Sequence, residues 1–275
     1  RRGLVPAALM GPLATLLTAR GVPSVDAAIA HHQLLIVLDG LRPDYVTPAL
    51  MPALSALAQR GVTFTNHHSV FPTVTRVNAS SISTGAYPER HGLLGNSVFF
   101  AQVGPRRFLA TDDRDNLLRI DPAAGGNLLT TMTLGEILDK SSQKLLVVSA
   151  GSSGSAFLLN HKVAGAGIVH WEFTVPESLA RAAARVPAEA GASAAAKDRR
   201  AVDAWLSVGL PELNPAVTIM WLTDPDTTAH DRGIGHPDTV TALRRRLMNM
   251  KPPQQIEQLL GALKRFPTNE DLVKG

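Results

Sequence analysis

The stretch QLLIVLDG, residues 33–40, is a continuous apolar run that ends in an Asp-Gly pair. Runs without polar alternation are typical of strands that are buried on both faces of a parallel sheet. Two further runs repeat this pattern, KLLVVSAG at 144–151 and AVTIMWLTD at 216–224. We therefore expect the first run to form a fully buried strand, and the other two to join it in one sheet.

Helical patterns separate these runs, and they lie at 51–61, 133–141 and 192–210. Strands that alternate with helices predict an α/β fold, a three-layer α/β/α sandwich with a mostly parallel central sheet. The polar and glycine-rich stretch 103–126 is interpreted as a surface loop or cap.

Composition limits the classes of function. The chain has 275 residues, 45% of them hydrophobic, which predicts one large domain. The formal charge of +4 comes from scattered basic residues, so no nucleic-acid groove is predicted. There is no cysteine, which excludes disulfides, thiolate catalysis and Cys-ligated zinc. Any metal ion would need Asp, Glu, His or hydroxyl ligands.

Residues 1–30 begin with two arginines, continue with an apolar stretch and end in Ala-Ile-Ala. This pattern indicates an export signal, of the twin-Arg type if the arginine pair belongs to it, and a periplasmic or extracellular protein. The catalytic domain is then expected at 31–275. Proline and glycine interrupt the apolar stretch, so no membrane span is expected. An ordinary N-terminal helix is the alternative.

Acidic residues follow two of the expected strands. Asp39 comes after the first run, and Asp224 and Asp226 come after the third. The carboxyl ends of parallel strands meet at one edge of a sheet, where ligands bind. Asp226 and His230 are four residues apart, so both could meet one ion on a helical turn. Each aspartate taken alone could equally cap a helix or a turn.

Two threonines, Thr73 and Thr75, precede a helical pattern within SVFPTVTRVNASSISTGAYPERHGLLGN, residues 69–96. A hydroxyl at a helix N-terminus lies among amides that favour an anion, so it could attack phosphorus once its proton is removed. The alternative is a hydroxyl that only caps the helix. Arg76 is open to two interpretations, a phosphate contact or a solvent-exposed side chain.

In order and spacing, three segments resemble the type I phosphodiesterase and nucleotide pyrophosphatase branch of the alkaline phosphatase superfamily: LLIVLDGLRPDYV, FPTVTRVNASSISTGAYPERHGLLGN and WLTDPDTTAHDRG. The resemblance covers about residues 33–240, and Thr75 lies 36 residues after Asp39. It implies an alkaline phosphatase-like domain that hydrolyses phosphodiester or nucleotide pyrophosphate bonds through a phospho-enzyme. The substrate would be a small, nucleotide-like phosphate ester.

The resemblance also implies two divalent metal ions, Zn²⁺, at the carboxyl edge of the sheet. Asp39 would bind one ion together with Thr75, and Asp226 and His230 would bind the other.

The same resemblance distinguishes the two threonines. Thr75 rather than Thr73 would be the nucleophile, because the family's threonine stands three residues before an asparagine, here Asn78. Asn96, 21 residues after Thr75, would donate a hydrogen bond to a phosphoryl oxygen.

The sequence departs from the family pattern after Val240, where the Asp-His pair of a Ser-Asp-His-Gly motif and a later histidine do not occur. Half of the zinc ligands of the family are therefore missing, and we expect each metal ion to bind weakly. We also expect the sheet to have an exposed edge, as in a truncated product or a fragment. Seven other histidines are interpreted as surface or supporting groups: His31, His32, His67, His68, His91, His161 and His170.

Two alternatives to the phosphodiesterase remain. One is a catalytically incompetent relative that binds phosphate-bearing ligands or a partner, and the other is a phosphomonoesterase of the same superfamily. A sulfatase is disfavoured, because the motifs C-x-P-S-R and S-x-P-S-R are absent.

Overall fold

The computed structural model describes residues 32–248, except 164 and 166. These residues belong to one compact unit, His31–Gly275. The expected export signal at 1–30 lies outside the described residues. In the described part of the chain, no helix has the length and apolar character needed to cross a bilayer.

A five-stranded sheet forms the centre of this unit, in the order β1-β7-β4-β5-β6. Its strands are β1 (Gln33–Leu38), β4 (Leu145–Ser149), β5 (Gly167–His170), β6 (Thr174–Val175) and β7 (Val217–Leu222). The first four strands in the spatial order run parallel, and β6 pairs antiparallel with β5. The three expected strands and the mostly parallel sheet are confirmed.

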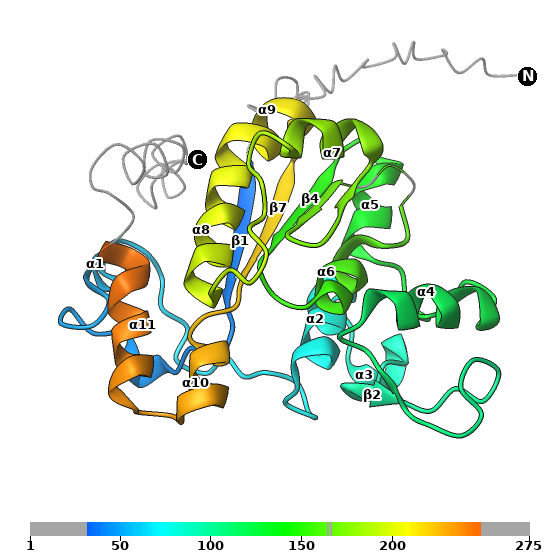
Figure 1. Ribbon diagram of the computed structural model, residues 1–275, viewed down its shortest axis with the longest axis horizontal. Helices are drawn as coiled ribbons and strands as arrows, with labels where there is room; N and C mark the ends of the chain where they lie inside the picture. The colour runs from blue at the N-terminus through cyan, green and yellow to red at the C-terminus, as the bar shows by residue number, and fades with distance from the viewer. Residues whose placement is uncertain (1–31, 164, 166, 249–275) are drawn as a thin grey trace, which may run out of the picture. The chain divides into compact units, whose positions relative to one another are not determined.

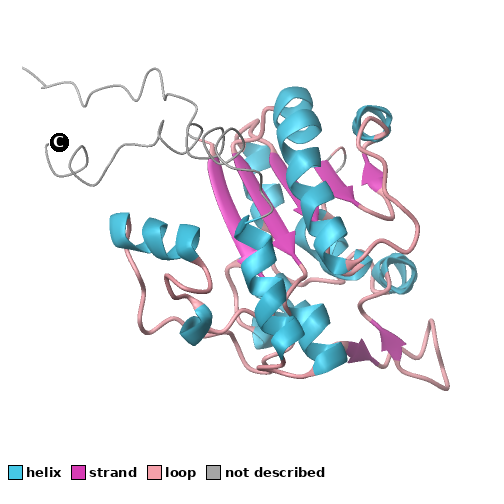
Figure 2. Cartoon of the chain, turned by 60° about the vertical axis from the view of Figure 1, so that its left-hand side comes forward, coloured by secondary structure: helices cyan, strands magenta, loops and turns pink. Residues whose placement is uncertain are grey.

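Helices cover both faces of the sheet (Figures 1 and 2). Those on one face are α2 (Thr75–Thr84), α5 (Leu134–Lys140) and α6 (Ser153–Asn160), and those on the other are α7 (Glu177–Ala183) and α8 (Ala194–Ala204). A π-helical turn, Trp205–Gly209, and α9 (Leu210–Leu213) continue α8. The predicted three-layer α/β/α architecture is therefore confirmed.

Strand β4 shows how one apolar run forms two cores. Successive side chains point to opposite faces of a sheet. Leu145 and Val147 pack with α5 and α6, whereas Leu146 and Val148 pack with α7 and α8. All four side chains are at most 3% exposed. An unbroken apolar run is thus the pattern that a strand covered on both faces requires.

Strand β1 was expected to be fully buried, and that expectation is wrong. β1 pairs with β7 alone in the described sheet and lies at its edge. Leu35 and Ile36, in the middle of the strand, are 44% and 41% exposed. The expected exposed sheet edge is present in the part of the chain that the structure describes.

The stretch 103–126, interpreted as a loop or cap, is partly helical. It contains α4 (Arg114–Ala123) and one strand of the small hairpin formed by β2 (Ser97–Val98) and β3 (Leu109–Ala110), which Figure 2 shows apart from the main sheet. Leu109 and Leu117 pack with Leu158 of α6 in a third core cluster. Helix α4 was missed because glycine, aspartate and arginine around it suggested a loop.

Shorter elements complete the described chain: a 3₁₀ turn (Pro43–Tyr45), α1 (Pro52–Arg60), α3 (Pro88–His91), α10 (Asp226–Arg232) and α11 (Pro237–Met248).

Candidate functional site

Strands β1 and β7 end side by side, which brings Asp39 next to the segment that contains Asp226. Leu38 pairs with Leu222 at the ends of the two strands. The backbone N–H of Asp39 donates to the carbonyl of Leu222 at 3.0 Å. The backbone N–H of Asp226 donates to the carbonyl of Asp39 at 3.2 Å. The expected meeting of both aspartates at the carboxyl edge of the sheet therefore occurs.

Gly40 makes this approach possible. Its φ is +69°, in the left-handed region that favours glycine. A Cβ atom at this position would lie 2.7 Å from the Cα of Asp226. The Asp-Gly pair that ends the first strand is therefore a requirement for close contact between β1 and α10.

The Asp39 carboxyl has a raised pKa of about 6. Burial is the main cause, and the negative charge of Asp226 adds to it. A hydrogen bond from Trp221 and the positive charge of Arg76 act in the opposite direction. Asp39 is half-buried and lies next to a second carboxylate, so a bound cation would stabilise the charged form of both groups.

Asp226 and His230 lie one turn apart on α10. The Oδ1 of Asp226 is 3.5 Å from the Nε2 of His230, and their side chains are 31% and 80% exposed. The spacing of four residues thus falls on a helical turn, as expected, and places the two side chains near each other. The imidazole is largely open to solvent.

Thr75 is the first residue of α2. The N-cap is Val74, whose backbone is extended and whose side chain makes no capping hydrogen bond. The interpretation of Thr75 as a cap is therefore wrong. Thr75 is half-buried, whereas Thr73 is exposed in the preceding loop. A helix N-terminus without a cap from its own N-cap residue can offer backbone N–H groups to an anion.

Asn96 contacts this helix end. Its Oδ1 accepts a hydrogen bond of 3.2 Å from the backbone N–H of Arg76. With Oδ1 committed to that bond, the Nδ2 amino group of Asn96 is the end of the side chain that can donate to a ligand. The structure thus brings Asn96 to the start of α2, next to Thr75, across 21 residues of sequence.

Asn78, whose spacing distinguished Thr75 from Thr73, has a structural role. Its Oδ1 accepts the backbone N–H of Val70 at 2.9 Å, and its Nδ2 donates to the carbonyl of Val74 at 3.0 Å. The loop before the helix is thereby fixed to the first turn of α2. Asn78 therefore holds the backbone on which Thr75 stands.

Arg76 is half-buried rather than fully exposed. Its Nε is buried and has no hydrogen-bond partner among the described residues. Burial lowers its pKa, and the charges of Asp112, Asp39 and Asp226 oppose that shift. The guanidinium therefore lies in the electrostatic field of the candidate site, which the sequence left undecided.

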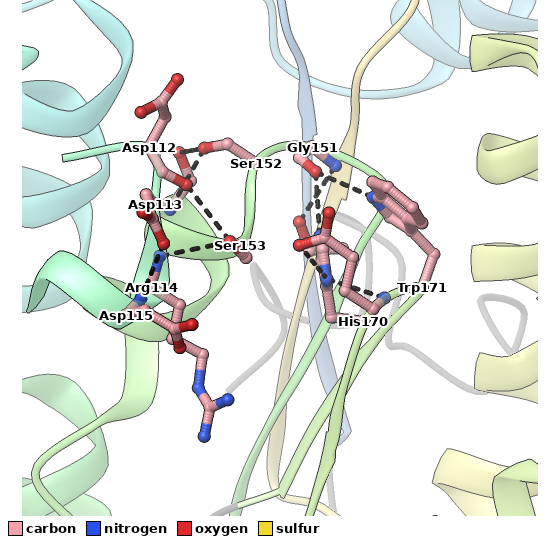
Figure 3. A network of polar contacts seen from close by, with 12 residues as sticks. Asp112, Asp113, Arg114, Asp115, Gly151, Ser152, Ser153, His170 and Trp171 are labelled. Atoms are coloured by element: carbon pink, nitrogen blue, oxygen red, sulfur yellow. Dashed lines mark hydrogen bonds and ion pairs between the residues drawn. The ribbon is translucent and has the colours of Figure 1, made fainter. Parts of the chain in front are cut away.

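A cavity of about 650 Å³ lies at the ends of β4 and β5, on the same edge of the sheet. Its lining residues are Asp112, Asp113, Arg114, Asp115, Ser152, Ser153, Trp171, Glu172 and Phe173. Figure 3 shows the two sides of this region, with Asp112 to Asp115 facing the loop that follows β4. No motif in the sequence indicated this cavity, because three separate segments form it.

Hydrogen bonds hold these segments together. The hydroxyl of Ser153 accepts from the backbone N–H of Arg114 at 3.2 Å and donates to the carbonyl of Asp112 at 3.3 Å (Figure 3). The guanidinium of Arg114 lies over the ring of Phe173, 4.3 Å from its centroid. The cavity wall is therefore built from cross-linked segments.

Two histidines interpreted as surface or supporting groups are part of the core. His91 is 0% exposed, and its Nε2 lies 3.0 Å from the hydroxyl of Ser81. His170 is 1% exposed, with its Nε2 2.9 Å from the carbonyl of Gly151. His67 and His68 are exposed, as expected. The surface interpretation fails for the first two because their sequence neighbours give no indication of burial.

The candidate metal ligands agree with a divalent cation in type but not in number. Two carboxylates, an imidazole and a hydroxyl are suitable donors for zinc. Within the described residues, however, no group of three or more His, Asp or Glu side chains is placed to hold a metal ion. The described part of the chain therefore supplies fewer ligands than a zinc site ordinarily has.

Comparison with known proteins gives a family match. The sequence pattern of the family described as type I phosphodiesterase / nucleotide pyrophosphatase matches residues 33–248. The chain is 38% identical over 90 residues to the bis(5'-adenosyl)-triphosphatase ENPP4 of Pongo abelii, a match that covers 33% of this chain and 20% of that protein.

Solved structures support the fold. Phosphonoacetate hydrolase from Sinorhizobium meliloti, in complex with phosphonoacetate, is similar with a TM-score of 0.56 and 20% identity, over 85% of this chain and 54% of that chain. An inactive form of murine ectonucleotide pyrophosphatase / phosphodiesterase 5 in complex with AMP is similar with a TM-score of 0.55 and 16% identity, over 86% and 53%. The chain thus spans about half the length of these solved relatives.

Proposed function

The chain belongs to the type I phosphodiesterase / nucleotide pyrophosphatase family, and from that premise we propose that it acts in the hydrolysis of phosphodiester or nucleotide pyrophosphate bonds, with Thr75 as the nucleophile. One observation carries the proposal. Thr75 begins a helix whose N-cap residue, Val74, makes no capping hydrogen bond, and the side chain of Asn96 accepts from the backbone N–H of the next residue. A phosphoryl group at this helix end would meet a hydroxyl, backbone amides and a side-chain amide.

The proposed reaction has two steps. First, the Oγ1 of Thr75 attacks phosphorus, its proton passes to solvent, and the bond from phosphorus to the leaving oxygen breaks as that oxygen takes up a proton. Water then attacks the phosphorus of this Thr75 ester, which still carries the other ester group of the substrate, releases the phosphorylated product and restores the hydroxyl. The Nδ2 of Asn96 and the amides at the start of α2 would stabilise the charge on the phosphoryl oxygens in both steps.

We propose that divalent ions assist this site. Asp39 and Thr75 would hold one ion, and Asp226 and His230 the other. Bound ions would lower the pKa of the threonine hydroxyl and neutralise phosphoryl charge. Support comes from the types of ligand and from the adjacent carboxylates, which lie close enough that the charge of Asp226 raises the pKa of Asp39.

We propose a small, nucleotide-like phosphate ester as the substrate. The support is the name of one relative, a bis(5'-adenosyl)-triphosphatase, and the AMP in the complex of another. Export through residues 1–30 is a further proposal, and cleavage after Ala30 in a secreting host would test it.

The nucleophile can be tested by trapping. The purified chain is mixed with zinc and a nitrophenyl nucleotide diester, quenched in acid and digested. We expect a nucleotidyl group on the peptide that contains Thr75, with release of nitrophenol, and none in Thr75→Ala. Thr73→Ala is the matched control, because Thr73 is exposed outside the helix and should still allow trapping. A trapped nucleotidyl group in Thr75→Ala would refute the assignment.

A further inference from the structure

The side chain of Arg76 has donors that the described structure does not use. Its Nε is buried without a hydrogen-bond partner. Removing an N–H from water without an acceptor costs free energy, and an incoming acceptor would recover it. The backbone of Arg76 is fixed, since its N–H donates to Asn96 and its carbonyl accepts from the hydroxyl of Ser80 at 2.9 Å. The guanidinium therefore extends from a fixed point beside the nucleophile.

Three carboxylates act on Arg76 without consuming its donors. The charges of Asp112, Asp39 and Asp226 favour the charged guanidinium against the effect of burial. None of them forms an ion pair or a hydrogen bond with it within the described residues. The N–H groups of the guanidinium therefore stay available to a ligand. A guanidinium binds phosphate oxygens in a two-point fork.

The surroundings of Arg76 also give its position along a bound substrate. Asp39 and Asp226 are at the ends of β1 and β7, whereas Asp112 lines the cavity at the ends of β4 and β5. The start of α2 is joined to the wall of that cavity, because Asn96 accepts the N–H of Arg76 with its side chain and the N–H of Thr111, which precedes Asp112, with its backbone carbonyl at 2.9 Å. If a substrate extends from Thr75 into the cavity, the group adjacent to its scissile phosphorus would lie beside Arg76.

We propose that Arg76 binds a second phosphoryl group, adjacent to the phosphorus that Thr75 attacks, and so selects pyrophosphate bonds over simple phosphodiesters. This inference rests on the proposed function. A simple diester carries one negative charge at the scissile phosphorus and offers Arg76 no second anionic group. A pyrophosphate places additional anionic oxygens beside it, and the fork of Arg76 can accept two of them.

Turnover of two substrates tests the selectivity. We compare kcat/KM for a dinucleoside triphosphate and for a nitrophenyl nucleotide diester in the unmodified chain, Arg76→Gln and Arg76→Lys. Arg76→Gln should lower kcat/KM about a hundredfold for the triphosphate and less than about threefold for the diester. Arg76→Lys should recover part of the loss, because it restores the charge but not the fork. Equal losses for both substrates would overturn the proposal.

The control and a binding measurement separate this inference from the proposed function. Arg60→Gln, at an exposed position in the last turn of α1, should change neither value. Calorimetry measures the binding of inorganic pyrophosphate and of methyl phosphate. A chelator is present to remove metal ions, and the measurement does not depend on turnover. We expect the unmodified chain to prefer pyrophosphate about tenfold and Arg76→Gln to lose that preference. Absent or unchanged pyrophosphate binding overturns the proposal, whereas Arg76-dependent binding without turnover refutes only the proposed reaction.

Discussion

The indole Nε1 of Trp221 donates a hydrogen bond of 3.1 Å to the Oδ2 of Asp39. Trp221 belongs to β7 and is 2% exposed, so the donor comes from the core beneath the candidate site. The bond lowers the pKa of Asp39 and thus opposes the effect of burial. A core residue therefore determines how the carboxylate is oriented and how readily it ionises.

Substituting Trp221 tests this relationship. Trp221→Phe keeps an aromatic ring in the core but removes the donor. We expect the free energy of unfolding to fall by about 1–2 kcal/mol and the pKa of Asp39 to rise further. Urea denaturation measures the first effect, and carboxyl NMR titration measures the second.

Trp205→Phe is the matched control. The Nε1 of Trp205 donates to the hydroxyl of Thr218 at 3.3 Å, in the core on the opposite face of the sheet. It should cost a similar free energy and leave the titration of Asp39 unchanged. If Asp39 titrates identically in both variants, the role assigned to Trp221 is wrong.

The sequence predicted those parts of the fold that depend on local pattern. β4 and β7 lie within unbroken apolar runs, and the helical periodicity at 192–210 corresponds to α8 and its continuation. β6 has two residues, and its pairing with β5, Val169 opposite Thr174, is a tertiary property. The edge position of β1 was missed for the same reason, because an apolar run gives no information about how many neighbours a strand has.

Local pattern also predicted only part of the candidate site. Strand ends and helical spacing indicated Asp39, Asp226 and His230, and the structure brings the two aspartates together. Trp221 and Arg76 were not assigned contacts with Asp39. Their relationship to it depends on the register between strands and on the packing of α2, which no spacing in the sequence expresses.

Stability should depend on the pH because of His170. Burial lowers the pKa of this imidazole from its ordinary 6.5 to about 4. Between these values the unfolded chain binds a proton that the folded chain does not bind. The contribution of His170 to stability is therefore lost as the pH falls from 6.5 towards 4, by up to about 3 kcal/mol. Asp39, whose pKa is raised to about 6, contributes with the opposite sign below pH 6, so the effect of His170 is read as the difference from a variant that lacks it. Urea denaturation at several pH values in this interval measures the slope.

His170→Gln should be less stable at neutral pH, because it alters the contact with Gly151, but its free energy of unfolding should fall less, or rise, as the pH is lowered from 6.5 to 4. His67→Gln, at an exposed position, is the control and should keep the slope of the unmodified chain. An identical slope in all three proteins would show that His170 does not titrate as described.

The exposed edge of the sheet predicts self-association. An edge strand presents unpaired backbone N–H and C=O groups to another chain, and β1 also exposes Leu35 and Ile36. Leu35→Lys should shift the population towards the monomer in sedimentation experiments, because charges on adjoining edges repel. Leu57→Lys, on α1 with a similar exposure of 43%, should have no effect. A chain that stays monomeric at high concentration would contradict the prediction.

Gly40 allows the close approach of Asp39 and Asp226, and two glycine substitutions can isolate that effect. Gly40 and Gly85 both have positive φ, +69° and +63°, but a Cβ at Gly85 would have no atom within 4 Å. Gly85→Ala should therefore lower the free energy of unfolding by only about 1 kcal/mol, because alanine is strained in the left-handed conformation. Gly40→Ala must in addition displace the backbone of Asp226, so the loss should be larger, about 2–3 kcal/mol.

The two variants should also differ at the candidate site. Displacing Asp226 from Asp39 separates the carboxylates, so Gly40→Ala should lower the pKa of Asp39 in an NMR titration and reduce turnover of the nucleotide diester. Gly85→Ala, at the far end of α2, should change neither. If both variants lost the same stability and the pKa of Asp39 stayed unchanged in both, the contact between the segments of Asp39 and Asp226 would not depend on glycine.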